Sequence, residues 1–267
     1  MRTRLTILAG RCLVAGGFTM AMTSAVVADD AEDEAPPTLS LEASYTGEIW
    51  GVADGGLEDG GAYIDALNLQ FALDLDRAFG WANAQAFVFG TATNGNSINE
   101  KTGDIQGPSN LESGVEMVRL YEAWIDQTFA GGRASLRVGL YDLNTEFDAG
   151  EVRALFINAS HGIGPDYAQS GLNGPSIWPV TSLGARFNWN FENGAYVRAA
   201  ILDGVPGDLE HPKRTTIDFD RGDGALIAGE VGLTNAEGRI WSLGAWGYTE
   251  EFPDLVGPAT HDDNFGF

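Results

Sequence analysis

Residues 181–202 read TSLGARFNWNFENGAYVRAAIL, and this stretch decides the fold. From Leu183 to Phe191 every second residue is apolar, and the residues between are polar or glycine. The second half alternates in the same way from Ala195 to Ile201. A period of two indicates β-strands whose two faces meet different surroundings. Asn193-Gly194 between the halves favours a tight hairpin, because both residues accept positive φ.

The same alternation recurs along the chain. We predict nine strands, at residues 39–50, 62–75, 82–92, 116–128, 132–142, 181–191, 195–203, 224–233 and 239–248. Strands of globular proteins average about 5–6 residues, whereas a tilted strand that crosses a bilayer needs about 9–11. The predicted lengths therefore favour membrane-spanning strands.

The connections between these segments alternate between long and short. Long connections cover 51–61, 93–115, 143–180 and 204–223, and short ones cover 76–81, 129–131, 192–194 and 234–238. This pattern is typical of an antiparallel up-and-down barrel with one elaborated end. We find no helical period of useful length and no second domain boundary.

Arginine positions predict which face meets lipid. Three arginines lie in the middle of predicted strands, at positions that alternate with apolar residues. They are Arg137, Arg186 and Arg198. An arginine on the lipid face at the bilayer centre costs about 2–4 kcal/mol, so we expect the arginines to point into a polar interior. In 116–128 the two parities are mixed. There we place Glu122 and Trp124 inward and Arg119 nearer the outer rim.

Composition excludes several classes of protein. The chain has 267 residues and a net charge of −23, which excludes nucleic acid as the natural partner. One cysteine excludes an intrachain disulfide framework. Beyond the N-terminus no stretch approaches about 18 continuous apolar residues, which excludes a helical membrane protein.

The N-terminus predicts export. Residues 1–28 combine a basic start, an apolar stretch and small residues before Asp29, as in a cleaved Sec signal peptide. Residues 29–38 form an acidic, proline-containing lead-in, and residues 39–267 form the barrel part. We therefore expect a Gram-negative outer-membrane location.

Several ordered motifs carry a family resemblance. They are LYEAW (120–124), RVGLYDLNTEF (137–147), NASHGIGP (158–165), QSGLNGPS (169–176), PVTSLG (179–184), AILDGVPGD (200–208), IDFD (217–220) and GDGA (222–225). Together they make roughly residues 40–250 resemble the carbohydrate-selective porin family (OprB-type). The resemblance implies a sixteen-stranded barrel that passes glucose-type sugars by diffusion, with residues 143–180 as a loop that constricts the pore.

The predicted strand number is smaller than the family implies. An odd count of nine cannot close a bacterial single-chain barrel. We therefore expect the chain to be the N-terminal part of such a porin, from a fragment or a truncated gene, and to form no stable pore alone. Phe267 resembles the terminal signal read by the barrel-assembly machinery, but residues 261–264 (HDDN) lack the alternation of a strand, so we expect the chain to stop as its tenth strand begins. The expected partners are the barrel-assembly machinery and outer-membrane lipid.

A sugar channel needs aromatic rings to stack on sugar faces and polar groups to bond hydroxyls. The candidate stacking residues are Trp124, Tyr141, Trp178 and Tyr196. The candidate hydrogen-bonding residues are Glu122, Arg137, Asp142, Asn144, Glu146, Arg186 and Arg198. For any one of them, bracing of a loop or a charge at the rim is the alternative role. Trp81, Trp189 and Trp241 are expected at the membrane interface near the short turns.

Other functions have weaker support. Asp218, Asp220 and Asp223 are weak candidates for a cation site, since their spacing departs from the calcium-loop pattern. No nucleophile elbow, phosphate loop or dinucleotide motif occurs, so we expect no cofactor and no enzymatic activity. The alternatives are a secreted or periplasmic carbohydrate-binding β-sandwich and an outer-membrane glycoside hydrolase that uses Glu122 and Asp142.

Overall fold

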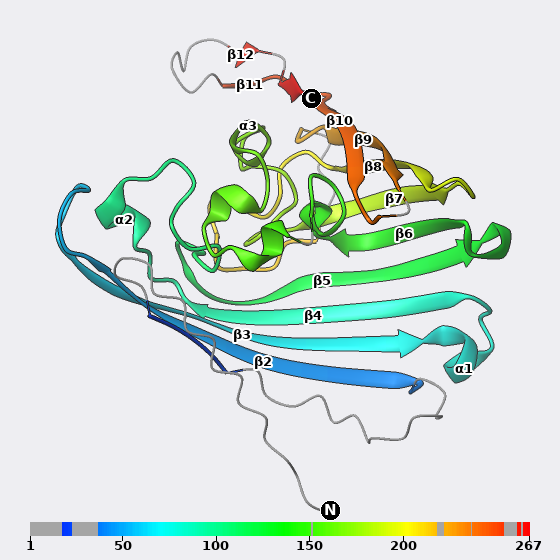
Figure 1. The fold of residues 1–267 in the computed structure, drawn as a ribbon, viewed down its shortest axis with the longest axis horizontal. Helices are drawn as coiled ribbons and strands as arrows, with labels where there is room; N and C mark the ends of the chain where they lie inside the picture. The colour runs from blue at the N-terminus through cyan, green and yellow to red at the C-terminus, as the bar shows by residue number, and fades with distance from the viewer. Residues whose placement is uncertain are drawn as a thin grey trace, which may run out of the picture.

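The computed structural model describes residues 18–22, 37–150, 152–217, 222–235, 237–253, 261–262 and 264–267. Its centre is one antiparallel sheet in which nine long strands each pair with their neighbours in the sequence (Figure 1). They are β2 (Leu39–Val52), β3 (Gly60–Asp74), β4 (Ala84–Asn94), β5 (Glu116–Phe129), β6 (Ala134–Tyr141), β7 (Ser182–Asn190), β8 (Ala195–Asp203), β9 (Ala225–Thr234) and β10 (Ile240–Tyr248). All nine predicted strands are confirmed, with bounds within two residues of the predicted ones.

The sheet is unclosed. β1 (Phe18–Met22) pairs with β2 at one end, and β13 (Phe265–Gly266) pairs with β10 at the other. β11 (Phe252–Pro253) and β12 (His261–Asp262) form a separate pair. β1 falls within the predicted signal peptide, and the rest of that segment lies outside the described residues.

Helices are confined to the connections. α1 (Leu75–Phe79) and the 3₁₀ turn η1 (Ala130–Gly132) lie in short turns, and α2 (Asn99–Thr102) lies in the connection from β4 to β5. The connection from β6 to β7 holds η2 (Leu143–Thr145), η3 (Arg153–Leu155), η4 (Ala159–His161) and α3 (Pro165–Ala168). In the described part of the chain, none of the helices has the length and apolar character needed to cross a membrane.

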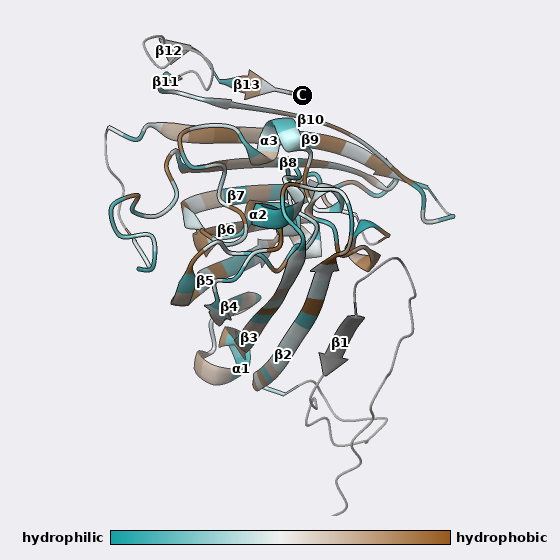
Figure 2. Cartoon of the chain, turned by 90° about the vertical axis from the view of Figure 1, so that its left-hand side faces the viewer, coloured by the Kyte–Doolittle hydropathy of each residue, from teal (hydrophilic) through white to brown (hydrophobic). Residues whose placement is uncertain are grey.

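The two faces of the sheet differ as the alternation predicts. On the outer face, Leu41, Val138 and Leu243 are 57%, 52% and 67% exposed. Hydrophobic and hydrophilic residues follow one another along the strands (Figure 2). On the inner face, Arg186 is only 2% exposed. Exposed aliphatic side chains on one face and buried charge on the other are the arrangement that lipid and a polar interior require.

β5 carries one extra residue opposite β4. Phe89 pairs with Glu122, but the next residue of β4 pairs with Leu120, so Tyr121 has no partner of its own. Such a β-bulge shifts the alternation by one residue. Arg119 and Tyr121 on one side of the shift and Glu122 on the other are therefore all buried. The mixed parity seen in the sequence of this strand has this cause.

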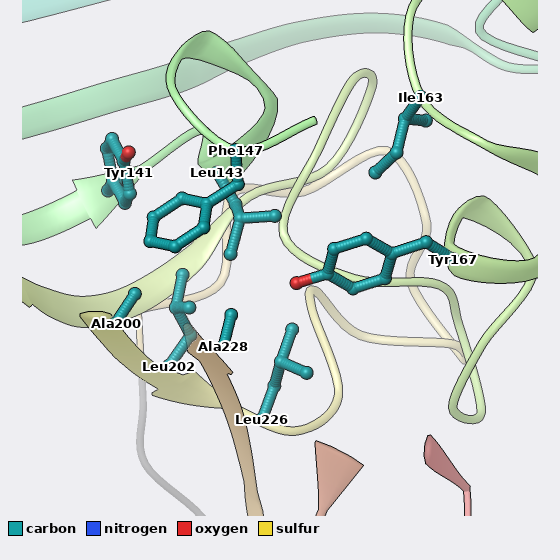
Figure 3. Close-up of a cluster of buried hydrophobic side chains, with 9 residues drawn as sticks. All are labelled: Tyr141, Leu143, Phe147, Ile163, Tyr167, Ala200, Leu202, Leu226 and Ala228. Carbon is teal, nitrogen blue, oxygen red and sulfur yellow. The ribbon is translucent and has the colours of Figure 1, made fainter. Parts of the chain in front are cut away.

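The long connection between β6 and β7 folds back onto the inner face of the sheet. Its apolar residues pack on β8 and β9 and form a core, drawn in Figure 3. The buried residues are Tyr141, Leu143, Phe147, Ile163, Tyr167, Ala200, Leu202, Leu226 and Ala228. Each large apolar side chain buried in this way contributes about 1.5–3 kcal/mol. The segment predicted to constrict the pore therefore lies against the inner wall.

The core extends to β10 through an aromatic stack. The ring of Tyr167 lies 4.9 Å from that of Trp246, with 6° between the two planes. Ser170 and Tyr248 add a hydrogen bond of 3.0 Å between their hydroxyls. The loop is thus held on three consecutive strands, β8 to β10.

Gly194 provides a test of the hairpin that the sequence predicted. Its φ is +83°, and a Cβ there would lie 2.4 Å from the carbonyl oxygen of Thr234. Gly238, in the turn between β9 and β10, has φ +77° with no atom within 4 Å of such a Cβ. We expect Gly194→Ala to lower the free energy of unfolding by about 2–3 kcal/mol and Gly238→Ala by about 1 kcal/mol. Urea unfolding in detergent micelles measures both, and equal losses would contradict this account.

Candidate functional site

An ion-pair network joins three strands to the long loop. Strand pairing places Arg137 of β6 directly opposite Arg186 of β7. Asp126 of β5 accepts from both, with Oδ2 3.1 Å from Arg137 Nε and 2.7 Å from a terminal nitrogen of Arg186. Arg186 Nε also donates to Glu146 Oε2 of the loop at 2.7 Å. Charge-assisted bonds of this length are among the strong ones in proteins.

Glu230 of β9 forms the centre of a second group. Its Oε1 lies 3.4 Å from a terminal nitrogen of Arg198 and accepts from the hydroxyl of Tyr196 at 2.8 Å. Its Oε2 accepts from the backbone N–H of Asp148 at 3.2 Å. Arg198 also donates to the carbonyl of Glu146. Together the two groups hold three arginines and three carboxylates, so their formal charge is zero.

Asp142, the first residue after β6, fixes the start of the loop. Its carboxylate accepts from Tyr121 at 2.5 Å and from the backbone N–H of Asn144 at 2.8 Å. Its own N–H donates to Glu122 at 3.3 Å. Removal from water disfavours the charged carboxylate, and this burial raises the pKa of Asp142 to about 6. Hydrogen bonds from its neighbours oppose the rise.

Two of the predicted stacking residues have no free face. Trp124 lies between the ring of Phe87, 4.9 Å away, and the guanidinium of Arg137, 3.8 Å from its centre. Tyr141 is 1% exposed, and its hydroxyl donates to Glu146 at 2.5 Å. The prediction that these two rings present a stacking face is corrected here, because neighbouring side chains already cover them. Gly139 makes room for Trp124, since a Cβ there would lie 2.6 Å from the tryptophan Cα.

The remaining predicted residues differ in their surroundings. Trp178 meets Tyr121 edge-on at 5.4 Å and donates to the carbonyl of Glu112 at 3.0 Å. Asn144 donates to the carbonyl of Phe147 at 3.0 Å and therefore braces the loop. Tyr196 is partly exposed beside Arg198. The structure thus brings the predicted set together around the loop, with Trp178 nearer the long-loop end of β5.

Arg119 links β5 to two long connections. Its side chain is 4% exposed and donates to the carbonyl of Pro179 at 2.6 Å and to that of Pro212. The backbone N–H of Leu120 donates to Thr215 at 2.9 Å. The expectation that Arg119 lies near the rim agrees with its place three residues from the long-loop end of β5. Through these contacts Arg119 attaches β5 to two loops, the one that contains Pro179 and the one that contains Pro212.

The acidic loop yields no cation site in the described residues. Asp218 and Asp220 lie outside the described residues, and Asp223 lies in the turn two residues before β9. Among the residues that the structure describes, no group of three or more histidine, cysteine or acidic side chains could hold a metal ion.

The sequence interpretation missed two central acceptors, Asp126 and Glu230. Both could have been found by parity. Asp126 shares its parity with Glu122 and Trp124, and Glu230 is the charged residue on the inward parity of β9. Their roles as partners of Arg137, Arg186 and Arg198 depend on cross-strand register, which alternation within one strand does not specify.

A curved antiparallel sheet with an apolar outer face, a charged inner face and a loop folded onto that inner face is the wall of a membrane-spanning β-barrel. The sequence matches the family described as carbohydrate-selective porin, OprB family, over residues 58–261. The chain therefore belongs to the carbohydrate-selective porin (OprB) family, as the sequence motifs predicted.

Individual relatives agree with this family. Porin B of Pseudomonas aeruginosa is 25% identical over 202 residues, which are 72% of this chain and 43% of the relative. The structure of OprB from Pseudomonas putida at high pH is similar with a TM-score of 0.65 and 19% identity, and the match covers 81% of this chain and 54% of that one. The chain thus spans about half the length of these relatives. The second similarity concerns the fold alone.

The pKa of Asp142 predicts how stability depends on pH. Between pH 4 and pH 6 the folded protein keeps a proton on Asp142 that the unfolded chain has lost, so the stability of the folded state falls as pH rises through this window. Asp142→Asn removes this dependence and retains an oxygen for the N–H of Asn144. Relative to wild type, we expect the variant to gain on the order of 2 kcal/mol between pH 4 and pH 7. Urea unfolding at both pH values measures it, and an unchanged difference would refute the assignment.

The contacts of Arg119 predict that the loop around Lys213 is protected from protease. Arg119→Gln removes the bonds to Pro179 and Pro212, so trypsin should cleave after Lys213 or Arg214 at least about tenfold faster. Arg133→Gln is the control, because Arg133 lies at the short-turn end and pairs with an exposed glutamate. Timed digestion followed by mass spectrometry gives the rates. Equal cleavage rates in the two variants would contradict the attachment of this loop by Arg119.

Proposed function

We propose that the chain supplies wall and constricting loop to an aqueous pore through which neutral carbohydrates diffuse across the outer membrane. The observation that supports this best is the charge balance of the ion-pair network on the inner face. Three buried or part-buried arginines are paired with three carboxylates, on a sheet whose other face is apolar. The family to which the chain belongs is described as carbohydrate-selective.

Charge balance suits a neutral, hydroxylated solute. A wall with surplus charge of one sign concentrates ions of the other sign. Paired charges leave a small net field, while hydroxyl groups can donate to carboxylates and accept from guanidiniums. Arg137 and Arg198 keep 15% and 18% of their side chains exposed, so we assign sugar contact to these two and to Tyr196. We assign to three neighbouring residues the role of holding these side chains in position: Arg186, Trp124 and Tyr141.

The outer face suits lipid. Apolar side chains cover it, and the aromatic residues Trp81 and Trp241, 48% and 71% exposed, lie at the short-turn end, where an interfacial belt is expected. We therefore propose an outer-membrane location with lipid as the surrounding partner, and delivery by the barrel-assembly machinery. A carbohydrate-binding sandwich would instead cover this apolar face with a second sheet.

A channel also explains Glu122 and Asp142 better than a hydrolase does. Glycoside hydrolysis needs two carboxyl groups about 5–9.5 Å apart with a sugar between them. Glu122 is 5% exposed and already accepts from the indole of Trp124 and from the N–H of Asp142. Asp142 accepts from Tyr121 and Asn144. Both carboxylates are thus engaged in holding the loop, which favours a passive pore over an enzyme.

Solute swelling tests the proposed function. Residues 39–253 are grafted onto the matching part of Porin B from Pseudomonas aeruginosa, which supplies strands to close the sheet. We expect proteoliposomes with this chimera to swell faster in glucose than in glucuronate or glucosamine, which have similar size but carry charge. Replacing Glu230 by glutamine leaves one arginine unpaired and should speed glucuronate relative to glucosamine. Equal rates for all three solutes in the parent chimera would contradict the proposal.

The chain alone provides a second measurement. Edge strands of an unclosed sheet expose N–H and C=O groups that lipid cannot satisfy, each at a cost of several kcal/mol. We therefore expect no stable, uniform conductance steps from the 267-residue chain in planar bilayers, whereas the chimera gives them. Uniform steps from the chain alone would mean that its sheet closes by itself or between copies.

A further inference from the structure

A row of polar side chains crosses the inner face nearer the short turns. Strand pairing places Asp74 of β3 opposite Gln85 of β4, and Gln85 opposite Asp126 of β5. Asp126 is opposite Arg137, and Arg137 is opposite Arg186. Neighbouring strands lie about 4.8 Å apart, so the row spans about 19 Å over five strands. It presents acceptors at the β3 end and guanidiniums at the β7 end.

The same five residues line an open hollow of about 780 Å³. Small-molecule sites occupy about 300–1,000 Å³, so the hollow has room for a monosaccharide with its water. It lies on the short-turn side of Trp124, and Ser40 and Thr128 contribute hydroxyl groups to its lining. The apolar core under the loop lies toward the opposite ends of the strands, at Tyr141, Leu202 and Leu226.

Two groups in the row have spare hydrogen-bonding capacity. Gln85 is exposed, and its amide makes no hydrogen bond to any residue that the structure describes. Arg137 uses Nε on Asp126, and its terminal nitrogens donate to no described residue. An amide offers two donors and an acceptor, and a guanidinium offers donors only. A hydroxylated ring can satisfy both at once.

Two of the three carboxylates in the hollow are paired with arginines. Asp126 is shared by two arginines, and Asp74 pairs with Arg77 at 3.2 Å. A cation would meet the guanidiniums of Arg137 and Arg186, and an anion would meet three carboxylates, since Asp76 also lines the hollow. A neutral ligand with several hydroxyl groups avoids both costs.

We propose that this row forms a binding subsite for a neutral polyol of monosaccharide size, which includes the short-turn part of the ion-pair network, with Gln85 and Arg137 as its contact residues. The inference deepens the proposed function, because a solute that leaves the constriction would occupy this subsite next. It predicts saturable, weak binding that can be measured on the chain itself without passage through a pore.

Ligand-observed saturation-transfer NMR on the full chain in detergent tests the subsite, with glucose, glucuronate and glucosamine as probes. Wild type should bind glucose saturably and the two charged probes at least about fivefold more weakly. Gln85→Leu should weaken glucose binding about fivefold, as expected for one lost hydrogen bond. Gln70→Leu is the matched control. Gln70 is the same residue type, placed on the inner face of β3 opposite Glu42 and Phe89, and it does not line the hollow.

A second variant keeps the test decisive if Gln85→Leu folds poorly. Gln85→Glu adds a carboxylate between Asp74 and Asp126, so the preference should shift from glucose toward glucosamine. Wild-type glucose affinity in folded Gln85→Leu, equal loss in both leucine variants, or equal binding of all three probes to wild type would overturn the subsite. Glucose passage in the chimera without saturable binding would reject the subsite alone, and binding without passage would reject the pore alone.

Discussion

The carboxylate of Asp126 is the acceptor on which the inner wall depends, because strand pairing sets two arginines directly opposite each other and both donate to it. Like charges at opposed positions repel. Arg186 is also almost fully withdrawn from water, and a buried charge that loses its partner destabilises a protein by about 3–5 kcal/mol. One carboxylate of β5 therefore links the side chains of three successive strands, β5, β6 and β7.

The same constraint extends to the loop. Arg186 reaches Glu146 on its other side, so the guanidinium connects the wall to the segment that folds onto it. Apolar packing of Phe147 and Tyr167 on β8 to β10 supplies the second attachment. The ion pair requires a particular orientation of its two groups, whereas the apolar packing does not. Together they fix both the position and the orientation of a segment that has little regular secondary structure.

The parts of the fold that depend on local pattern were predictable. Alternation located every strand from β2 to β10, and the cost of arginine in lipid identified the inner face at Arg137, Arg186 and Arg198. Register between strands was not predictable, because a period of two is satisfied by many pairings. For that reason the partners Asp126 and Glu230 were missed, and Trp124 was expected to offer a free face although Phe87 and Arg137 cover it. The packing of Phe147 depends on contacts between residues about 55 to 80 positions apart, to which no local signal refers.

The bulge at Tyr121 has a consequence for how β5 tolerates insertions and deletions. Along the rest of the wall, loss of one residue would exchange the lipid-facing and interior sets over everything on one side of the change. In β5 the bulge already makes this exchange. Arg119 before the bulge and Glu122 after it both face the interior, so neither charge is turned toward lipid. Odd-numbered residues therefore face the interior before the bulge, and even-numbered residues face it after the bulge. A variant that lost Tyr121 would restore a regular ladder, because Leu120 and Glu122 already pair with the adjacent residues Gly90 and Phe89, and Arg119 and Glu122 would both still face the interior. The alternation of β5 therefore tolerates the loss of one residue at the bulge.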